Sequence, residues 1–135
     1  MVNEGKHKKS LERLCRSESL EIIGENPVGI ELIFIEPHYF NPQHTKDLTC
    51  PDMFIKYYRG DWTVIELKST DQNYHKAVSQ IESGIDLIVK SFQADIRKIV
   101  GKVVYYGYGY NFHYMLTHSF EKGHNIINGI EMPQL

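Results

Sequence analysis

Three charged residues at the ends of two expected strands, Asp52, Glu66 and Lys68, could form a metal-dependent catalytic site. Asp52 opens the run 52–58, and Glu66 and Lys68 close the run 62–68. Alternation along a strand puts Glu66 and Lys68 on the same face, roughly 7 Å apart. Two carboxylates that face each other repel unless a proton or a cation lies between them. Their oxygens suit Mg²⁺ or Mn²⁺, and a lysine beside them could orient or deprotonate a water, so these residue types suit phosphodiester hydrolysis.

Whether Asp52 lies on the same face of the hairpin as Glu66 depends on the length of the loop between the two strands. With a three-residue loop of Tyr58, Arg59 and Gly60, Asp52 lies directly opposite Glu66. Gly60 suits this loop, because three-residue hairpin loops favour glycine at a left-handed position. A two-residue loop would turn Asp52 to the other face, and the three charges would then be only the solvated surface of a hairpin.

The hydrophobic pattern around the hairpin predicts a mixed α/β domain. Leucines and isoleucines over residues 10–23 predict a short, kinked helix that Ser10 or Ser17 caps and that Gly24 and Pro27 end. The further expected elements are a strand within residues 29–40, hairpin strands at 52–58 and 62–68, a long helix at 74–92 and a strand at 99–112. In this α-β-β-β-α-β order the sheet is antiparallel at the hairpin and parallel where the long helix crosses over.

Length and composition are those of one globular domain. The chain has 135 residues, of which 41% are hydrophobic and 24% charged, so a packed core is expected over residues 10–135. The polar, lysine-rich residues 1–9 are expected to be a flexible N-terminus, and the tail from His113 stays unassigned. Two cysteines, without the spacing of a zinc site or of a disulfide framework, favour a cytoplasmic protein. No apolar run is long enough for a membrane span, so no membrane association is expected.

The hairpin resembles the signature of the PD-(D/E)XK nuclease superfamily. Pro51-Asp52 is followed, after thirteen residues, by Glu66-Leu67-Lys68, and in the family the aspartate opens one strand and the ExK motif closes the next. SESLEIIGENP, residues 17–27, is similar to the leading helix of archaeal branched-DNA and Mrr-like endonuclease domains. HKAVSQIESGIDLI, residues 75–88, is similar to the helix that follows the hairpin. The resemblance covers about residues 17–106 in element order and implies a restriction-endonuclease-like core, a central mixed sheet flanked by helices.

The resemblance also implies a chemistry. It implies a Mg²⁺-dependent endonuclease, with Mn²⁺ able to substitute, that hydrolyses phosphodiester bonds in nucleic acid, commonly DNA. Asp52 and Glu66 would bind the metal, with Leu67 as a further metal-binding position, and Lys68 would serve the water and the scissile phosphate. Gln80 would point back at the site from the long helix. Members commonly self-associate to cut both strands, so a homodimer is one arrangement that the resemblance implies.

A glutamate of the leading helix supports the metal shell in the family. Glu18 is the first choice for this role, Glu21 the second and Glu12 the third. Four residues after Gln80, where many relatives carry a tyrosine, this chain has Gly84.

Other features leave plainer interpretations open. Trp62 could line a substrate groove or cover the hairpin, and the aromatic run 105–114 could stack bases or pack in the core. Four basic residues could contact phosphates or only improve solubility: Lys90, Arg97, Lys98 and Lys102. The net charge of −2 does not favour a nucleic-acid binder. The alternative function is therefore an inactive module of the same fold that binds nucleic acid or a protein partner.

Overall fold

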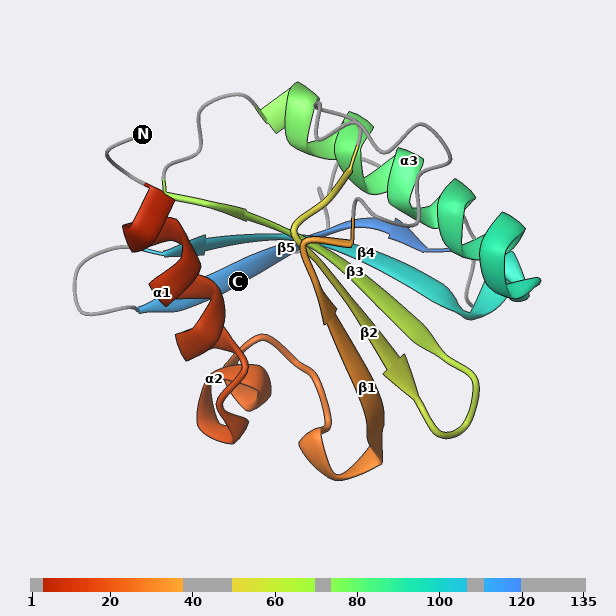
Figure 1. The fold of residues 1–135 in the computed structure, drawn as a ribbon, viewed down its shortest axis with the longest axis horizontal. Coiled ribbons are helices and arrows are strands. Elements are labelled where there is room, and N and C mark those ends of the chain that lie inside the picture. The colour runs from red at the N-terminus through yellow and green to blue at the C-terminus, as the bar shows by residue number, and fades with distance from the viewer. Residues whose placement is uncertain (1–3, 38–49, 70–73, 107–110, 120–135) are drawn as a thin grey trace.

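A five-stranded mixed sheet with helices on both faces forms the domain (Figure 1). The computed structural model describes residues 4–37, 50–69, 74–106 and 111–119. The helices are α1 (Glu4–Leu14), α2 (Ser17–Ile22) and α3 (Tyr74–Phe92), with short 3₁₀ turns at Pro27–Gly29 and Ile96–Lys98. The strands are β1 (Ile30–Ile35), β2 (Met53–Tyr57), β3 (Trp62–Lys68), β4 (Ile99–Tyr106) and β5 (Phe112–Ser119). This confirms the expected α/β class with a central mixed sheet.

The strands lie in the order β1-β2-β3-β4-β5. Only the β3–β4 pair is parallel in the described sheet, and the other neighbours are antiparallel. A parallel pair needs a long crossover, and α3 supplies it between β3 and β4. The sequence pattern predicted the antiparallel hairpin, the parallel crossover and the bounds of the long helix, but not the place of β5.

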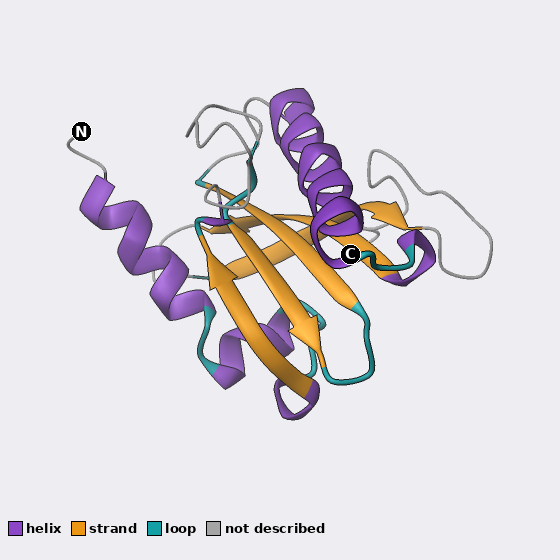
Figure 2. Cartoon of the chain, turned by 45° about the vertical axis from the view of Figure 1, so that its right-hand side comes forward, coloured by secondary structure: helices purple, strands orange, loops and turns teal. Residues whose placement is uncertain are grey.

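Two apolar clusters lie on the two faces of the sheet. On one face, α3 packs over Phe54, Trp62 and Val64. On the other face, leucines of α1 and α2 pack against Ile65 and Leu67. Figure 2 shows α3 on one side of the sheet and the two N-terminal helices on the other. Alternate residues of β3 therefore belong to different environments, which makes a shift of its register by one residue very unfavourable.

The β2–β3 hairpin has the three-residue loop that the sequence allowed. Met53 pairs with Ile65 and Lys56 with Trp62, and the Tyr57 N–H donates to the Asp61 carbonyl at 2.9 Å. Tyr58, Arg59 and Gly60 remain as the loop, and Gly60 has φ +96°, a conformation in which a Cβ would be strained. The loop geometry and the apolar pattern thus specify the same register.

Three elements differ from the expectation. Helix α1 begins at Glu4, before the expected cap Ser10, which lies buried within the helix. The chain breaks after Leu14, because Arg16 is extended, and α2 starts at Ser17 with no side-chain capping bond. The strand expected over 99–112 ends at Tyr106 in β4, and residues 107–110 lie outside the described ranges. The unassigned tail contributes β5, which pairs antiparallel with β4.

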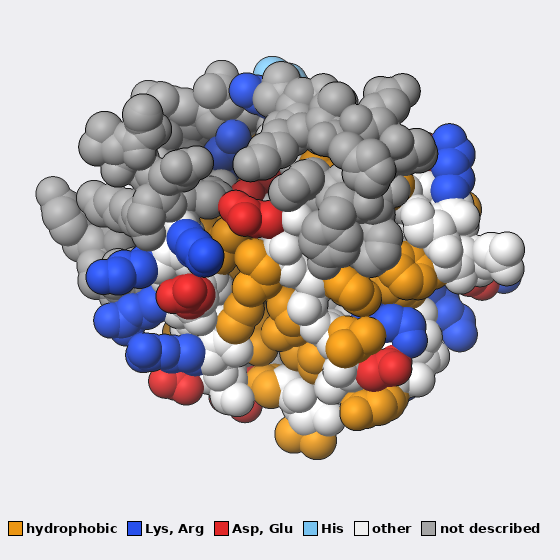
Figure 3. Space-filling view, in the orientation of Figure 1, with side chains coloured by type: hydrophobic (Ala, Val, Ile, Leu, Met, Phe, Trp, Pro, Cys, Tyr) orange, Lys and Arg blue, Asp and Glu red, His pale blue; other side chains and the backbone are white. Residues whose placement is uncertain are grey.

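The outer strand β1 is the least covered strand of the described sheet. Its residues are half-buried or exposed, and Leu32 keeps 47% of its surface accessible. Just before it, Val28 is 89% exposed. In the view of Figure 3, hydrophobic side chains gather between charged side chains on both flanks.

None of the described helices is long and apolar enough to cross a membrane.

Candidate functional site

The hairpin register ends at the Met53–Ile65 pair, and Asp52 lies just before it, close to Glu66 and Leu67 of β3. The Asp52 Oδ2 accepts a hydrogen bond from the Leu67 N–H at 2.8 Å, and the Asp52 N–H donates to the Ile65 carbonyl at 3.1 Å. Pro51, which precedes Asp52, has no N–H to continue the ladder. The carboxylate of Asp52 thus takes the place of a main-chain partner of β3, and this bond orients it beside Glu66.

Glu66 is buried with a charged neighbour on each side. Only 5% of its surface is accessible, and the Lys68 Nζ lies 3.7 Å from its Oε2. Burial raises the pKa of Glu66 to about 9, and the nearby Asp52 carboxylate also raises it, whereas Lys68 acts in the opposite direction. Without a bound cation, Glu66 is therefore protonated at neutral pH.

Gln80 reaches the same face of the sheet from α3. Its side chain is buried, and its Nε2 donates a long hydrogen bond of 3.4 Å to the Cys50 carbonyl, next to Pro51 and Asp52. The Oε1 atoms of Gln80 and Glu66 are both buried and have no hydrogen-bond partner among the described residues. An unpaired buried acceptor costs roughly 1–3 kcal/mol, so these two oxygens favour a cation or a water as their missing partner.

Gly84 brings α3 close to the start of β2. A Cβ at position 84 would lie 2.6 Å from the Pro51 Cγ and 3.0 Å from the Val64 Cγ1. Only glycine allows this approach without a shift of Pro51 or Val64. Gly84 thus allows α3, which carries Gln80, to pack closely against the Pro51-Asp52 segment.

Gly84→Ala is expected to destabilise the protein by about 1–2 kcal/mol, because overpacking against the rigid Pro51 ring, at up to about 3 kcal/mol, outweighs the gain of about 1 kcal/mol in helix propensity. Chemical denaturation of the two proteins measures the difference. In a Pro51→Ala background the same substitution should destabilise much less. A single Gly84→Ala variant that is as stable as the parent protein, or more stable, would contradict this packing.

The glutamates proposed from the leading helix do not reach this pair in the structure. Glu18 and Glu21 are exposed on α2, and Glu12 is exposed on α1. Both helices pack on the sheet face opposite to α3, so their exposed residues point away from Glu66. Within the described residues, no group of three or more His, Cys, Asp or Glu side chains is arranged to hold a metal ion.

Leu67 can take part only through its main chain. Its side chain is buried on the α1 side with Ile65, because successive residues of a strand point to opposite faces. Its N–H already binds Asp52. A metal-binding role at this position would therefore fall to its carbonyl oxygen.

Several other predicted positions have a structural role. Trp62 packs against Phe34 and Phe92 under α3, with ring centroids 6.1 and 4.7 Å away, so it covers the hairpin. Lys102, predicted to be a surface cation, is only 6% exposed, and this prediction was wrong. Lys90, Arg97 and Lys98 are exposed, as expected. In the aromatic run, Tyr105 and Phe112 are buried core residues.

A buried polar cluster around Glu25 has no counterpart in the sequence predictions. Glu25 follows Gly24 after α2 and is 7% exposed. Its Oε1 accepts hydrogen bonds from the Tyr57 hydroxyl at 2.5 Å and the Thr63 hydroxyl at 2.8 Å, and its Oε2 pairs with the Lys102 Nζ at 2.6 Å. A single lysine within the β-branched run of β4 was the signal that could have indicated a buried ion pair.

Asp52, Glu66, Lys68 and Gln80 thus meet on one face of the sheet, between the ends of β2 and β3 and the helix α3. The two carboxylates and the amide oxygen can hold a hard divalent cation, and the lysine ammonium beside them can position a water or a phosphate. Comparison of the chain with protein-family models, with curated proteins and with solved structures finds no significant match.

Proposed function

We propose that the protein is a metal-dependent nuclease of the PD-(D/E)XK type that hydrolyses phosphodiester bonds in DNA. The observation that carries the proposal is the cluster at this end of the hairpin, where Asp52 accepts a hydrogen bond from the Leu67 N–H at 2.8 Å, next to Glu66, and the Lys68 Nζ lies 3.7 Å from the Glu66 carboxyl. The two unpaired buried oxygens support a cation at this position. Mg²⁺ needs only one or two protein carboxylates, because waters and substrate oxygens complete its octahedron.

Each residue has a defined part in this proposal. Asp52, oriented by the Leu67 N–H, supplies a carboxylate that is already fixed in place. Glu66 supplies the second carboxylate when it loses its proton, and the amide oxygen of Gln80 is available at the same face. A bound Mg²⁺ or Mn²⁺ would activate a water and neutralise charge on the phosphate. Lys68 would hold its positive charge next to the attacked phosphate and stabilise the charge that develops there.

The affinity for Mn²⁺ is expected to rise about tenfold from pH 7 to pH 8 and about fivefold from pH 8 to pH 9. The reason is that binding requires ionised Glu66, whose pKa lies at about 9, so each pH unit below that value reduces the ionised fraction about tenfold. Titration calorimetry in buffers of different ionisation enthalpy would measure the affinity and the release of about one proton for each ion bound.

Three variants define the Mn²⁺ experiment. Glu66→Gln should abolish binding without loss of fold, since an amide resembles the protonated acid, and Asp52→Asn should weaken binding strongly. Glu82→Gln, an exposed change on α3, should bind Mn²⁺ like the parent protein. An affinity that does not change with pH, or that survives in Glu66→Gln, would place the cation elsewhere.

Cleavage is the direct test of the function. The purified protein should cut at least one DNA in a panel of linear, branched, flapped and single-stranded substrates with Mg²⁺ or Mn²⁺, and EDTA should stop the reaction. Asp52→Asn should not cut. If the protein cuts none of these substrates, the nuclease proposal is refuted.

A second candidate is a module of the same fold that binds nucleic acid or a protein without catalysis. The exposed positions of Glu12, Glu18 and Glu21 favour it, because no described acidic residue joins Asp52 and Glu66. Such a module should bind Mn²⁺ weakly, and its Mn²⁺ affinity should not rise with pH as Glu66 ionises. The same calorimetric titration therefore separates the two candidates.

A further inference from the structure

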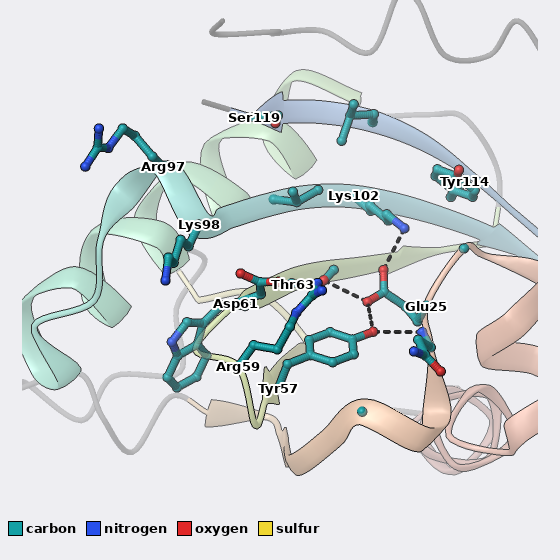
Figure 4. A pocket seen from close by; sticks show the side chains of 16 residues that line it. Glu25, Tyr57, Arg59, Asp61, Thr63, Arg97, Lys98, Lys102, Tyr114 and Ser119 are labelled. Carbon is teal, nitrogen blue, oxygen red and sulfur yellow. Dashed lines mark hydrogen bonds and ion pairs between the residues drawn. The ribbon is translucent and has the colours of Figure 1, made fainter. Parts of the chain in front are cut away.

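A pocket lies at the opposite end of β3 from Glu66 and Lys68. Its volume is about 640 Å³, within the range of small-molecule sites. It lies between the turn after α2 and the first residues of β3 and β4, on the sheet face that α3 does not cover (Figure 4). Asp52, Glu66, Lys68 and Gln80 do not line it. The pocket is therefore separate from the proposed metal site.

The floor of the pocket is polar and held by hydrogen bonds. Glu25 connects Tyr57, Thr63 and Lys102, as the dashed lines in Figure 4 show. The Lys102 ammonium also donates to the Ile23 carbonyl at 2.6 Å and lies 4.3 Å from the centre of the Tyr114 ring. These contacts fix the ammonium in the floor of the pocket. Such a floor is organised before any ligand enters.

The rim of the pocket is basic. Arg59 comes from the hairpin loop, and Arg97 and Lys98 come from the 3₁₀ turn before β4. All of them have exposed or half-exposed side chains. Arg59 pairs with Asp61 and Arg97 with Asp95, but surface ion pairs of this kind contribute only about 0–1 kcal/mol and can open for a ligand. Four cationic and two acidic side chains line the pocket, so an anion is the favoured occupant.

We propose that this pocket binds a small organic phosphate of mononucleotide size. Arginine and lysine at the rim match a phosphate, which arginine can hold by two parallel hydrogen bonds. The polar floor and the Tyr57 and Tyr114 rings leave partners for the organic part of the molecule. The phosphate could belong to a free nucleotide or to the phosphorylated end of a DNA strand. The proposal does not depend on the nuclease function.

Calorimetry with five probes tests this site: inorganic phosphate, dTMP, thymidine, a short 5′-phosphorylated oligonucleotide and the same oligonucleotide without the phosphate. We expect dTMP or the phosphorylated strand to bind with a Kd below about 1 mM at low salt, and thymidine and the unphosphorylated strand not to bind at this site. Binding of dTMP identifies a free nucleotide as the ligand. Binding of the phosphorylated strand without dTMP identifies a strand end.

Matched variants locate the binding. The double variant Arg97→Gln/Lys98→Gln should weaken it at least tenfold, whereas Lys90→Gln on α3 and Asp52→Asn in the metal site should leave it unchanged. Both basic residues of the pair are exposed, so the variant should keep the fold. No binding of dTMP or of the phosphorylated strand at about 10 mM, equal binding of thymidine, or full affinity in the double variant would overturn the proposal.

Discussion

Lys68→Met should lower the rate of phosphodiester cleavage by roughly 10²–10⁴-fold, the usual contribution of a positioned group that transfers a proton or stabilises developing charge. The Lys68 ammonium lies 3.7 Å from the Glu66 carboxyl, and part of the lysine side chain remains accessible to a substrate. Methionine keeps the unbranched apolar stem and removes the ammonium. Single-turnover cleavage with saturating Mn²⁺ measures the loss.

The matched control is Lys90→Met, because Lys90 is exposed on α3 and pairs with Asp86 away from the site. It should cleave DNA at the parental rate. Mn²⁺ should still bind to Lys68→Met, since Asp52 and Glu66 are unchanged. If Lys68→Met cleaves as fast as Lys90→Met, Lys68 has no part in the reaction, and the proposed mechanism fails at this step.

Glu25→Ala should destabilise the protein by about 3–5 kcal/mol, the usual effect of removing one partner of a buried ion pair. The substitution leaves the Lys102 ammonium, which is 6% exposed, without its carboxylate, and the Tyr57 and Thr63 hydroxyls lose their acceptor. For a chain of this size, the melting temperature should fall by on the order of 10 °C. Chemical and thermal denaturation would measure both quantities.

Replacing Lys102 as well as Glu25 should restore stability. In the double variant Glu25→Ala/Lys102→Met no buried charge remains, so most of the lost stability should return. Glu21→Ala, an exposed change on α2, should have little effect. Equal stability of Glu25→Ala and Glu21→Ala would show that the buried cluster does not hold α2 to the sheet.

Local patterns were sufficient to predict the elements around the site. The apolar spacing over residues 74–92 predicted α3 with its bounds, and the alternation in β3 predicted the common face of Glu66 and Lys68. The position of Gly60 indicated the loop length and therefore the facing of Asp52. These features depend on residues that are close together in the sequence, within one helix or one hairpin. A sequence pattern can therefore predict them.

Contacts between distant segments could not be predicted in this way. The Glu25–Lys102 pair joins residues 77 positions apart, and a carboxylate after a helix resembles any surface acid. The exposure of Glu18 follows from the break at Arg16 and from the face that α2 buries, and neither is visible in the spacing of glutamates. From the sequence, Gly84 is only a residue of low helix propensity. Its reason, the close contact with the Pro51 ring, is seen only in the structure.

The burial of Glu66 makes the site unfavourable for the stability of the fold itself. The unfolded chain ionises this carboxyl near pH 4.5 and the native chain only at about pH 9, so the native state binds one more proton over this interval. Stability therefore falls as the pH rises from 4.5 to 9, by about 3 kcal/mol at pH 7. Mutations that replace Glu66 by a neutral residue would be favoured by selection for stability alone. In a protein that used this fold only for binding, such mutations of Glu66 would accumulate. A nuclease would have to retain Glu66 despite its cost in stability.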